Sequence, residues 1–175
     1  MRSSRNSSAS SAGCTTTAST IRSPVAASRR RGSPRAGLER VVGRILAWEG
    51  VSPPRCRVEL TLLGAPAMRR LNRRATGRRS LTDVIAFALP QPDGTVLGDV
   101  YICPAAASAW VHDRQTGNGN RKTVDEELVR LTVHGTLHVL GYDHPEGPGR
   151  TRSAMWHRQE RYVRRLLGTR GERTR

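Results

Sequence analysis

At residues 133–144 the chain reads VHGTLHVLGYDH. Its first two histidines, His134 and His138, are four residues apart, so on a helix both imidazoles leave the same face one turn apart. Gly141 favours a left-handed residue at the end of that helix, where a sharp turn would bring His144 back beside the other two. Three imidazoles that leave one coordination position open are typical of a catalytic zinc site. We therefore expect these three histidines to bind one zinc ion per chain.

The residues around the histidines predict a buried helix. Between residues 131 and 140 the two histidines are the only ionisable side chains, and the others are Leu, Val, Thr or Gly. Thr123 and Glu126 have the spacing of a capping box, which predicts that this helix begins there. A single histidine on an apolar face is more often a satisfied core residue than a ligand. Three histidines with a glycine before the third favour metal binding instead.

The histidine spacing also matches that of metzincin-type zincin proteases, with one difference. Those proteases have a glutamate, the general base, directly after the first histidine. This chain has Gly135 at that position. Proteolysis by that mechanism is therefore not expected.

Residues 134–144 resemble the signature of the YbeY family, which are bacterial metal-dependent single-strand endoribonucleases. Two upstream regions resemble other parts of the same family: Leu71 and Asn72 followed by TDVIAF at residues 82–87, and LGDVYI at residues 97–102. The order and spacing of these motifs fit, so the resemblance covers about residues 38–167. It implies one α/β (α+β) domain of zincin-like YbeY fold, with a small mixed sheet of about four strands packed with helices.

The resemblance also implies a function in ribosomal RNA processing, including 3′-end maturation of small-subunit rRNA, and in ribosome quality control. The expected partners are single-stranded ribosomal RNA and ribosomal subunits or assembly factors, with no membrane and no small-molecule cofactor. Two alternatives stay open from the sequence. One is a non-catalytic RNA-binding assembly factor, and the other is a zincin-like metallohydrolase of a different substrate.

The chain departs from the family in the loop before residue 82. Many relatives have an arginine at the position of Thr76 and a proline at that of Leu81. We expect Arg78 or Arg79 to take the role of that arginine, so that its guanidinium group would clamp the scissile phosphate. A basic loop in solvent is the alternative interpretation.

Three aspartates are candidates for orienting a histidine through its second ring nitrogen. Asp83 and Asp99 lie within or beside predicted strands, where aspartate is disfavoured, and Asp143 precedes His144. Each could equally hydrogen-bond the backbone of a turn. The sequence does not rank them.

Composition limits the class of protein and its partners. At 175 residues the chain suits a single domain, and its formal net charge of +16 indicates a polyanionic partner such as RNA. A bias in the base composition of the genome would also produce an arginine-rich chain with this charge. Aromatic residues are only 4% of the chain, so we expect backbone charge rather than base stacking to dominate RNA affinity.

Cysteine content and hydrophobic patterning indicate where the protein acts. Three cysteines without a pairing pattern favour a reducing compartment. No run of residues has the length and apolarity of a membrane span or a signal peptide. We therefore expect a bacterial cytoplasmic protein.

We predict three regions along the chain. Residues 1–36 are rich in Ser, Thr and Arg, lack acidic residues and are expected to be a disordered basic extension. Three interpretations of that extension stay open from the sequence: it is dispensable, it is an RNA-contacting arm, or it is an organelle transit peptide. Residues 37–168 form the YbeY-like endoribonuclease domain, and residues 169–175 form a basic tail.

Hydrophobic periodicity predicts the elements of that domain. Helices are expected at residues 38–48, near residues 67–74, and at 105–112, 123–140 and 151–168, with an alternating strand at 56–62. The second of these helices carries four arginines, which either face solvent or contact RNA. Residues 84–89 are apolar on both faces and predict a central strand, joined by a turn at 92–95 to an antiparallel strand at 96–103.

Overall fold

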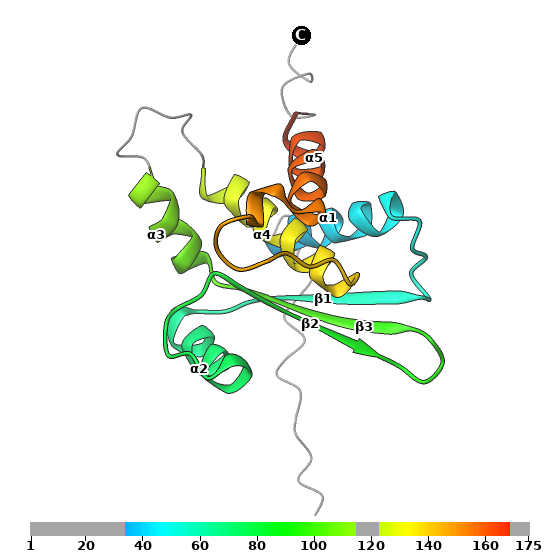
Figure 1. Cartoon of the computed structure of the whole chain (residues 1–175), viewed down its shortest axis with the longest axis horizontal. Coiled ribbons are helices and arrows are strands. Elements are labelled where there is room, and N and C mark those ends of the chain that lie inside the picture. The colour runs from blue at the N-terminus through cyan, green and yellow to red at the C-terminus, as the bar shows by residue number, and fades with distance from the viewer. Residues whose placement is uncertain (1–33, 115–122, 169–175) are drawn as a thin grey trace, which may run out of the picture.

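The computed structural model describes residues 34–114 and 123–168 (Figure 1). The elements in chain order are α1 (Pro34–Trp48), β1 (Cys56–Leu62), α2 (Ala65–Thr76), β2 (Val84–Pro90), β3 (Val96–Ile102), α3 (Pro104–Arg114), α4 (Val124–Val139), the short 3₁₀ helix η1 (Arg150–Arg152) and α5 (Ala154–Gly168). These elements form one mixed α/β domain. All predicted helices and strands are present, with ends that differ by a few residues.

The first helix begins earlier than the sequence predicts. It starts at Pro34, so the proposed boundary between extension and domain at residues 36 and 37 falls inside α1. The rest of the predicted disordered extension, the loop at 116–120 and the basic tail lie outside the described residues. Within the described residues, no helix is long and apolar enough to cross a membrane.

The described part of the sheet has three strands, fewer than the four or so expected, in the order β1-β3-β2. Strands β1 and β3 are parallel, with Leu60 opposite Val100. Strands β2 and β3 form the predicted antiparallel hairpin, with Ala86 opposite Val100. Within the described residues, β2 pairs with β3 alone and therefore lies at an edge of the sheet.

The prediction that residues 84–89 form the central strand is wrong, because β3 occupies the centre. One face of β2 lies under α4, and Phe87 on the other face packs edge-on against Tyr101, with ring centroids 6.1 Å apart. Leu89, near the end of the strand, is 49% exposed. The apolar run of β2 therefore reflects packing against α4 on one face and against Tyr101 on the other, and it did not require a central position in the sheet.

The helices cover the two faces of the sheet unequally. In Figure 1, α1, α4 and α5 lie on one side of the sheet and α2 lies on the other. Two groups of buried apolar residues fill the first side. One group joins α1 and α4 to the sheet and includes Val42, Leu60 and Val100. The other joins α1, α4 and α5 and includes Ile45, Leu137 and Met155.

Helix α4 approaches the sheet closely because two glycines lie at the contact. A Cβ built on Gly135 would lie 2.5 Å from Cγ1 of Val100, and one built on Gly98 would overlap the side chain of Val139. Real carbon atoms do not approach so closely, so larger residues would force the helix away. The two glycines thus determine the depth and rotation of α4 on the sheet.

Both ends of α4 follow the sequence prediction. Thr123 Oγ1 accepts from the backbone N–H of Glu126 at 3.2 Å, and the Glu126 carboxylate accepts from the backbone N–H of Thr123 at 2.9 Å. Beyond the last turn, Gly141 has a φ of 86°, which a residue without Cβ adopts at little cost. The capping box and this glycine fix where the helix starts and where the chain turns.

We predict that Gly135→Ala destabilises the protein by about 1–3 kcal/mol, because the added methyl group overlaps Val100 in a packed core. Gly43→Ala on α1 is the matched control, since a Cβ there meets nothing within 4 Å. That substitution should stabilise the protein by up to about 1 kcal/mol through helix propensity. Denaturant unfolding of both variants measures the two effects, and equal stability of the two would contradict the packing assignment.

Candidate metal centre

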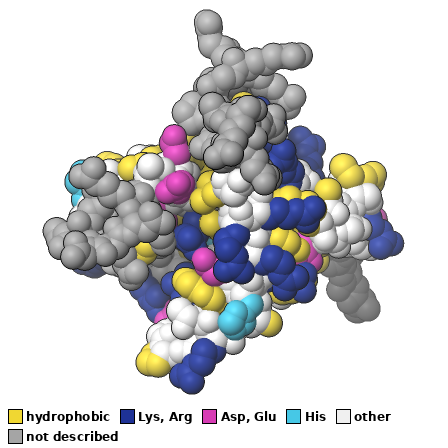
Figure 2. All heavy atoms as spheres, turned by 90° about the horizontal axis from the view of Figure 1, so that it is seen from above, with side chains coloured by type: hydrophobic (Ala, Val, Ile, Leu, Met, Phe, Trp, Pro, Cys, Tyr) yellow, Lys and Arg dark blue, Asp and Glu magenta, His cyan; other side chains and the backbone are white. Residues whose placement is uncertain are grey.

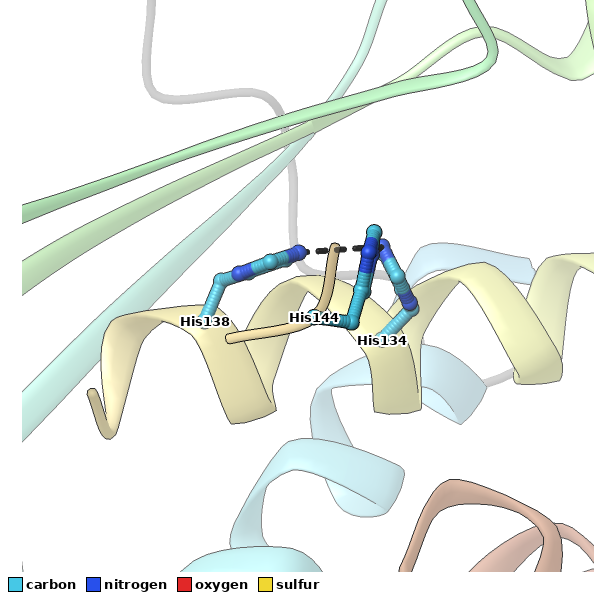
Figure 3. Close-up of side chains that lie close together, drawn as sticks. All are labelled: His134, His138 and His144. Atoms are coloured by element: carbon cyan, nitrogen blue, oxygen red, sulfur yellow. Dashed lines mark hydrogen bonds between the residues drawn. The ribbon is translucent and has the colours of Figure 1, made fainter. Parts of the chain in front are cut away.

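Three histidine rings meet at one point beside the end of α4. His134 and His138 project from α4, and His144 reaches back from the loop that follows (Figure 3). Nε2 of His134 lies 3.1 Å from Nε2 of His138 and 3.4 Å from Nε2 of His144. One ring nitrogen from each residue lies within 4.8 Å of the other two. The predicted juxtaposition of the three side chains is therefore present.

In two of the rings, the second nitrogen faces a carbonyl oxygen. Nδ1 of His134 lies 2.8 Å from Oε1 of Gln159, and Nδ1 of His144 lies 3.1 Å from the carbonyl oxygen of Pro145. The Gln159 amide nitrogen donates to a Glu160 carboxylate oxygen at 3.2 Å, which leaves its oxygen to face the imidazole. Carbonyl and amide oxygens only accept, so Nδ1 must carry the proton in both rings.

The converging nitrogens consequently present lone pairs to one another. With their protons on Nδ1, Nε2 of His134 and Nε2 of His144 are both acceptors, and two acceptors 3.4 Å apart repel. A cation between them removes this repulsion and accepts both lone pairs, and Nε2 of His138, 3.1 Å from Nε2 of His134, is placed to supply a third. The donor set therefore fits a metal ion bound through three Nε2 atoms, with the Nδ1 contacts fixing the ring orientations.

Burial keeps two of these rings neutral, as metal ligation requires. His134 is only 7% exposed, and its burial lowers its pKa to about 4. Burial also lowers the pKa of His138, and the charge of nearby His144 acts in the same direction. The side chain of His138 is nevertheless 28% exposed. The centre therefore opens to solvent on the His138 side, where a substrate can reach it.

A buried carboxylate anchors the turn between the second and third histidines. Glu49, at the end of α1, accepts hydrogen bonds from the hydroxyls of Tyr142 at 2.8 Å and Tyr162 at 2.5 Å, and from Arg158 at 2.8 Å. Its side chain is 8% exposed, and these donors lower its pKa against the opposing effect of burial. Tyr142 lies two residues before His144. The contact thus ties the loop that carries the third histidine to α1 and α5.

The structure distinguishes the three candidate aspartates. Asp143 Oδ1 lies 3.9 Å from Nδ1 of His138 and accepts from the backbone N–H of His144 at 2.7 Å. Asp83 accepts from the backbone of Val84 instead. Asp99 interacts with Tyr101, and burial raises its pKa. Of the three, Asp143 is the one that adjoins a histidine of the centre.

The structure also explains why residue 135 is glycine, at the position where zincin proteases have their general base. Gly135 faces Val100 and Val84 of the sheet, so a side chain there would point into the core. A glutamate at this position would have no space, because its Cβ would lie 2.5 Å from Cγ1 of Val100.

Comparison with known proteins gives the family. The family model described as Endoribonuclease YbeY matches residues 30–167, most of the chain. The chain belongs to the YbeY family. The sequence resemblance is therefore confirmed, and membership makes the chain an endoribonuclease that acts in ribosomal RNA processing.

Individual YbeY relatives support the assignment. The chain is 32% identical over 111 residues to the endoribonuclease YbeY of Thermotoga sp. strain RQ2, covering 63% of this chain and 68% of the relative. It is 41% identical over 86 residues to that of Bordetella pertussis, covering 49% of this chain and 51% of the relative. A solution structure from Thermotoga maritima is similar with a TM-score of 0.56 and 26% identity, covering 83% of this chain and 89% of that one.

The two arginines predicted to replace the YbeY arginine lie in an exposed loop. The Arg78 guanidinium group forms an ion pair at 3.1 Å with Glu146, two residues after His144. Arg79 is exposed and forms no ion pair within the described residues. Arg150 on η1, which sequence reasoning missed, is close enough for its charge to lower the pKa of His134 and His138. Arg150 thus brings positive charge to the centre, whereas Arg78 lies beside the loop that carries His144 with its charge paired to Glu146.

Sequence reasoning also missed Gln159 and Glu49. Gln159 is 2% exposed and shares the inward face of α5 with Met155, Tyr162 and Val163. A polar residue at an apolar position was a usable signal that its amide had a buried partner. Glu49 gave no comparable signal, because its partners lie 93 to 113 residues further along the chain.

We predict that Gln159→Leu weakens binding of Zn²⁺, used as the probe ion, by about 10- to 100-fold, because Nδ1 of His134 loses its acceptor. Gln159→Glu keeps an acceptor of similar size and should retain most of the affinity. Competition titration against a chelator measures both variants. Wild-type affinity in the leucine variant would show that Gln159 does not orient the ring.

Proposed function

We propose that this chain is a zinc-dependent, single-strand-specific endoribonuclease that matures ribosomal RNA, including the 3′ end of small-subunit rRNA, in the bacterial cytoplasm. The convergence of three Nε2 atoms in a YbeY chain carries the proposal. The imidazoles of His134, His138 and His144 are the proposed ligands. Ribosomal subunits or assembly factors are the proposed partners. The proposed catalytic domain, predicted at residues 37–168, also includes the start of α1 at Pro34.

Zinc is the ion that this donor set favours. Three neutral imidazoles with an open fourth position are typical of catalytic zinc sites, whereas Mg²⁺ and Ca²⁺ prefer oxygen ligands. When bound, the ion would supply Lewis acidity toward an oxygen of the scissile phosphate. The histidines would hold it, and Gln159 and the Pro145 carbonyl would keep their rings in the ligating orientation.

The arginines near the centre would hold the substrate. The proposed phosphate clamp is Arg78 or Arg79, supported by the contact of Arg78 with the loop that carries His144. In the Arg78–Glu146 pair the side chains are 63% and 80% exposed, so the pair contributes little to stability. A phosphate can therefore replace Glu146 as the partner of Arg78 at little cost. Arg150 would add positive charge from the opposite loop.

The test is cleavage of a 5′-labelled single-stranded ribosomal RNA fragment by the full chain, with bound zinc quantified. We predict that His138→Ala lowers both zinc content and cleavage, the latter by at least about 100-fold, because losing a ligand exceeds the effect of losing a ligand's hydrogen-bond partner. His157→Ala is the matched control. His157 is an exposed histidine on α5, and its loss should change neither quantity.

Other outcomes would favour the alternatives. If the wild type binds zinc and RNA but cuts no more than the His138→Ala variant, the protein is a non-catalytic assembly factor. If it cuts no RNA but hydrolyses a peptide or another ester in a zinc-dependent way, it is a metallohydrolase of a different substrate.

A further inference from the structure

Helix α2 carries four arginines on its exposed surface. Arg69, Arg70, Arg73 and Arg74, here called the arginine ridge, are all exposed. The opposite side of the helix buries Met68 and Asn72. Because successive arginines are one, three and one positions apart, they form a continuous stripe within two turns of the helix.

The arginine ridge has no acidic counterpart within the described structure. Helix α2 contains no Asp or Glu, and none of the four arginines forms an ion pair with any described residue. The face over α5 is different. There, Figure 2 shows basic side chains interspersed with acidic and hydrophobic ones.

The arginine ridge also opposes the stability of its own helix. Arg69 with Arg73, and Arg70 with Arg74, are like charges four residues apart, each pair costing about 0.2–0.5 kcal/mol. Arg73 and Arg74 lie in the last turn, where the helix dipole favours them, but Arg69 and Arg70 do not. A local conflict of this kind is expected where charge serves a partner.

The arginine ridge is physically connected to the metal centre. The side-chain amide of Asn72 donates to the carbonyl oxygen of Ser80 at 2.9 Å, which fastens α2 to the following loop. Thr76 donates to Asn72 at 2.9 Å, and Gly77 ends the helix with a φ of 76°. The same loop carries Arg78, whose partner Glu146 lies two residues from His144. The loop after α2 thus connects the arginine ridge, through the Arg78–Glu146 ion pair, to the loop that carries His144.

We propose that the arginine ridge binds the phosphates of single-stranded RNA and leads the strand, through Arg78, to the metal centre. The inference rests on the proposed function in taking RNA as the substrate. Four guanidinium groups without an ion-pair partner among the described residues suit a polyanion with regularly spaced charges. The hydrogen bond from Asn72 to Ser80 holds their helix beside the loop that carries Arg78, which favours the substrate strand over a separate acidic protein. Binding would depend on charge rather than on base identity.

The experiment measures binding of a labelled single-stranded RNA to the full chain at several salt concentrations, in a His138→Ala background that does not cut the probe. The variant replaces the arginine ridge with four alanines. The control removes four exposed arginines from the other side of the sheet, Arg40, Arg44, Arg161 and Arg164. A third protein replaces the arginine ridge with four lysines, which keep the charge.

The salt dependence should separate these proteins. Each phosphate contact on a single strand contributes about 0.7 to the slope of log K against log salt, so four alanines should make the slope shallower by about 3. The lysine variant should keep nearly the wild-type slope, and the control should change it much less than the alanine variant. A cooperative thermal unfolding transition in each of the four proteins establishes that they fold.

Two results would overturn the inference. An unchanged slope in the alanine variant would mean that the arginine ridge does not contact RNA and serves another partner, such as an acidic protein. An equal change in the control would mean that net charge alone is responsible. Cleavage by the chain with His138 restored is measured separately. If the salt slope depends on the arginine ridge but the chain does not cleave RNA, the proposed nuclease activity is refuted and the proposed RNA-binding surface is supported. If the chain cleaves RNA but the slope does not depend on the arginine ridge, the nuclease activity is supported and the RNA-binding surface is refuted.

Discussion

The close contact of α4 with the central strand is the constraint on which the rest of the structure depends. Gly135 and Gly98 leave no space for a Cβ against Val100 and Val139, so α4 can lie at this depth only with glycine at both positions. Because the rotation of the helix is fixed there, His134 and His138 must face sideways from the sheet and toward the following loop. The same contact removes the position that a zincin protease uses for its general base. A single packing contact therefore both places the two helix histidines of the candidate metal centre and leaves no space for a side chain at residue 135.

The orientation of the ligands depends on contacts from distant parts of the chain. Gln159 on α5 holds the ring of His134, and Glu49 on α1 holds Tyr142 in the turn that returns His144. Burial makes these contacts strong, since an unpaired polar group in the same place would be costly. The proposed phosphate clamp differs from this buried set. The Arg78 and Glu146 side chains are exposed and weakly paired, which lets them exchange partners.

Local sequence signals predicted the histidine centre and most of the fold. Histidines four residues apart, a glycine after the helix and a capping box at Thr123 are local patterns, and all three appear as expected. The failures concern tertiary arrangement. An apolar run at residues 84–89 cannot reveal that β3 lies in the centre of the sheet, because sheet order depends on which strands meet in space. Likewise, Gln159 and Glu49 act through partners that no spacing rule connects to them.

X-ray absorption spectroscopy of the zinc-loaded full chain tests the central claim most directly. The account predicts three imidazole nitrogens at about 2.0–2.1 Å from the ion, with the remaining coordination supplied by oxygen. His157→Ala should leave the spectrum unchanged, since His157 lies on the exposed side of α5. Fewer than three imidazoles, or a sulfur ligand at about 2.3 Å, would contradict it. Either result would mean that the converging Nε2 atoms of His134, His138 and His144 are not together the metal site.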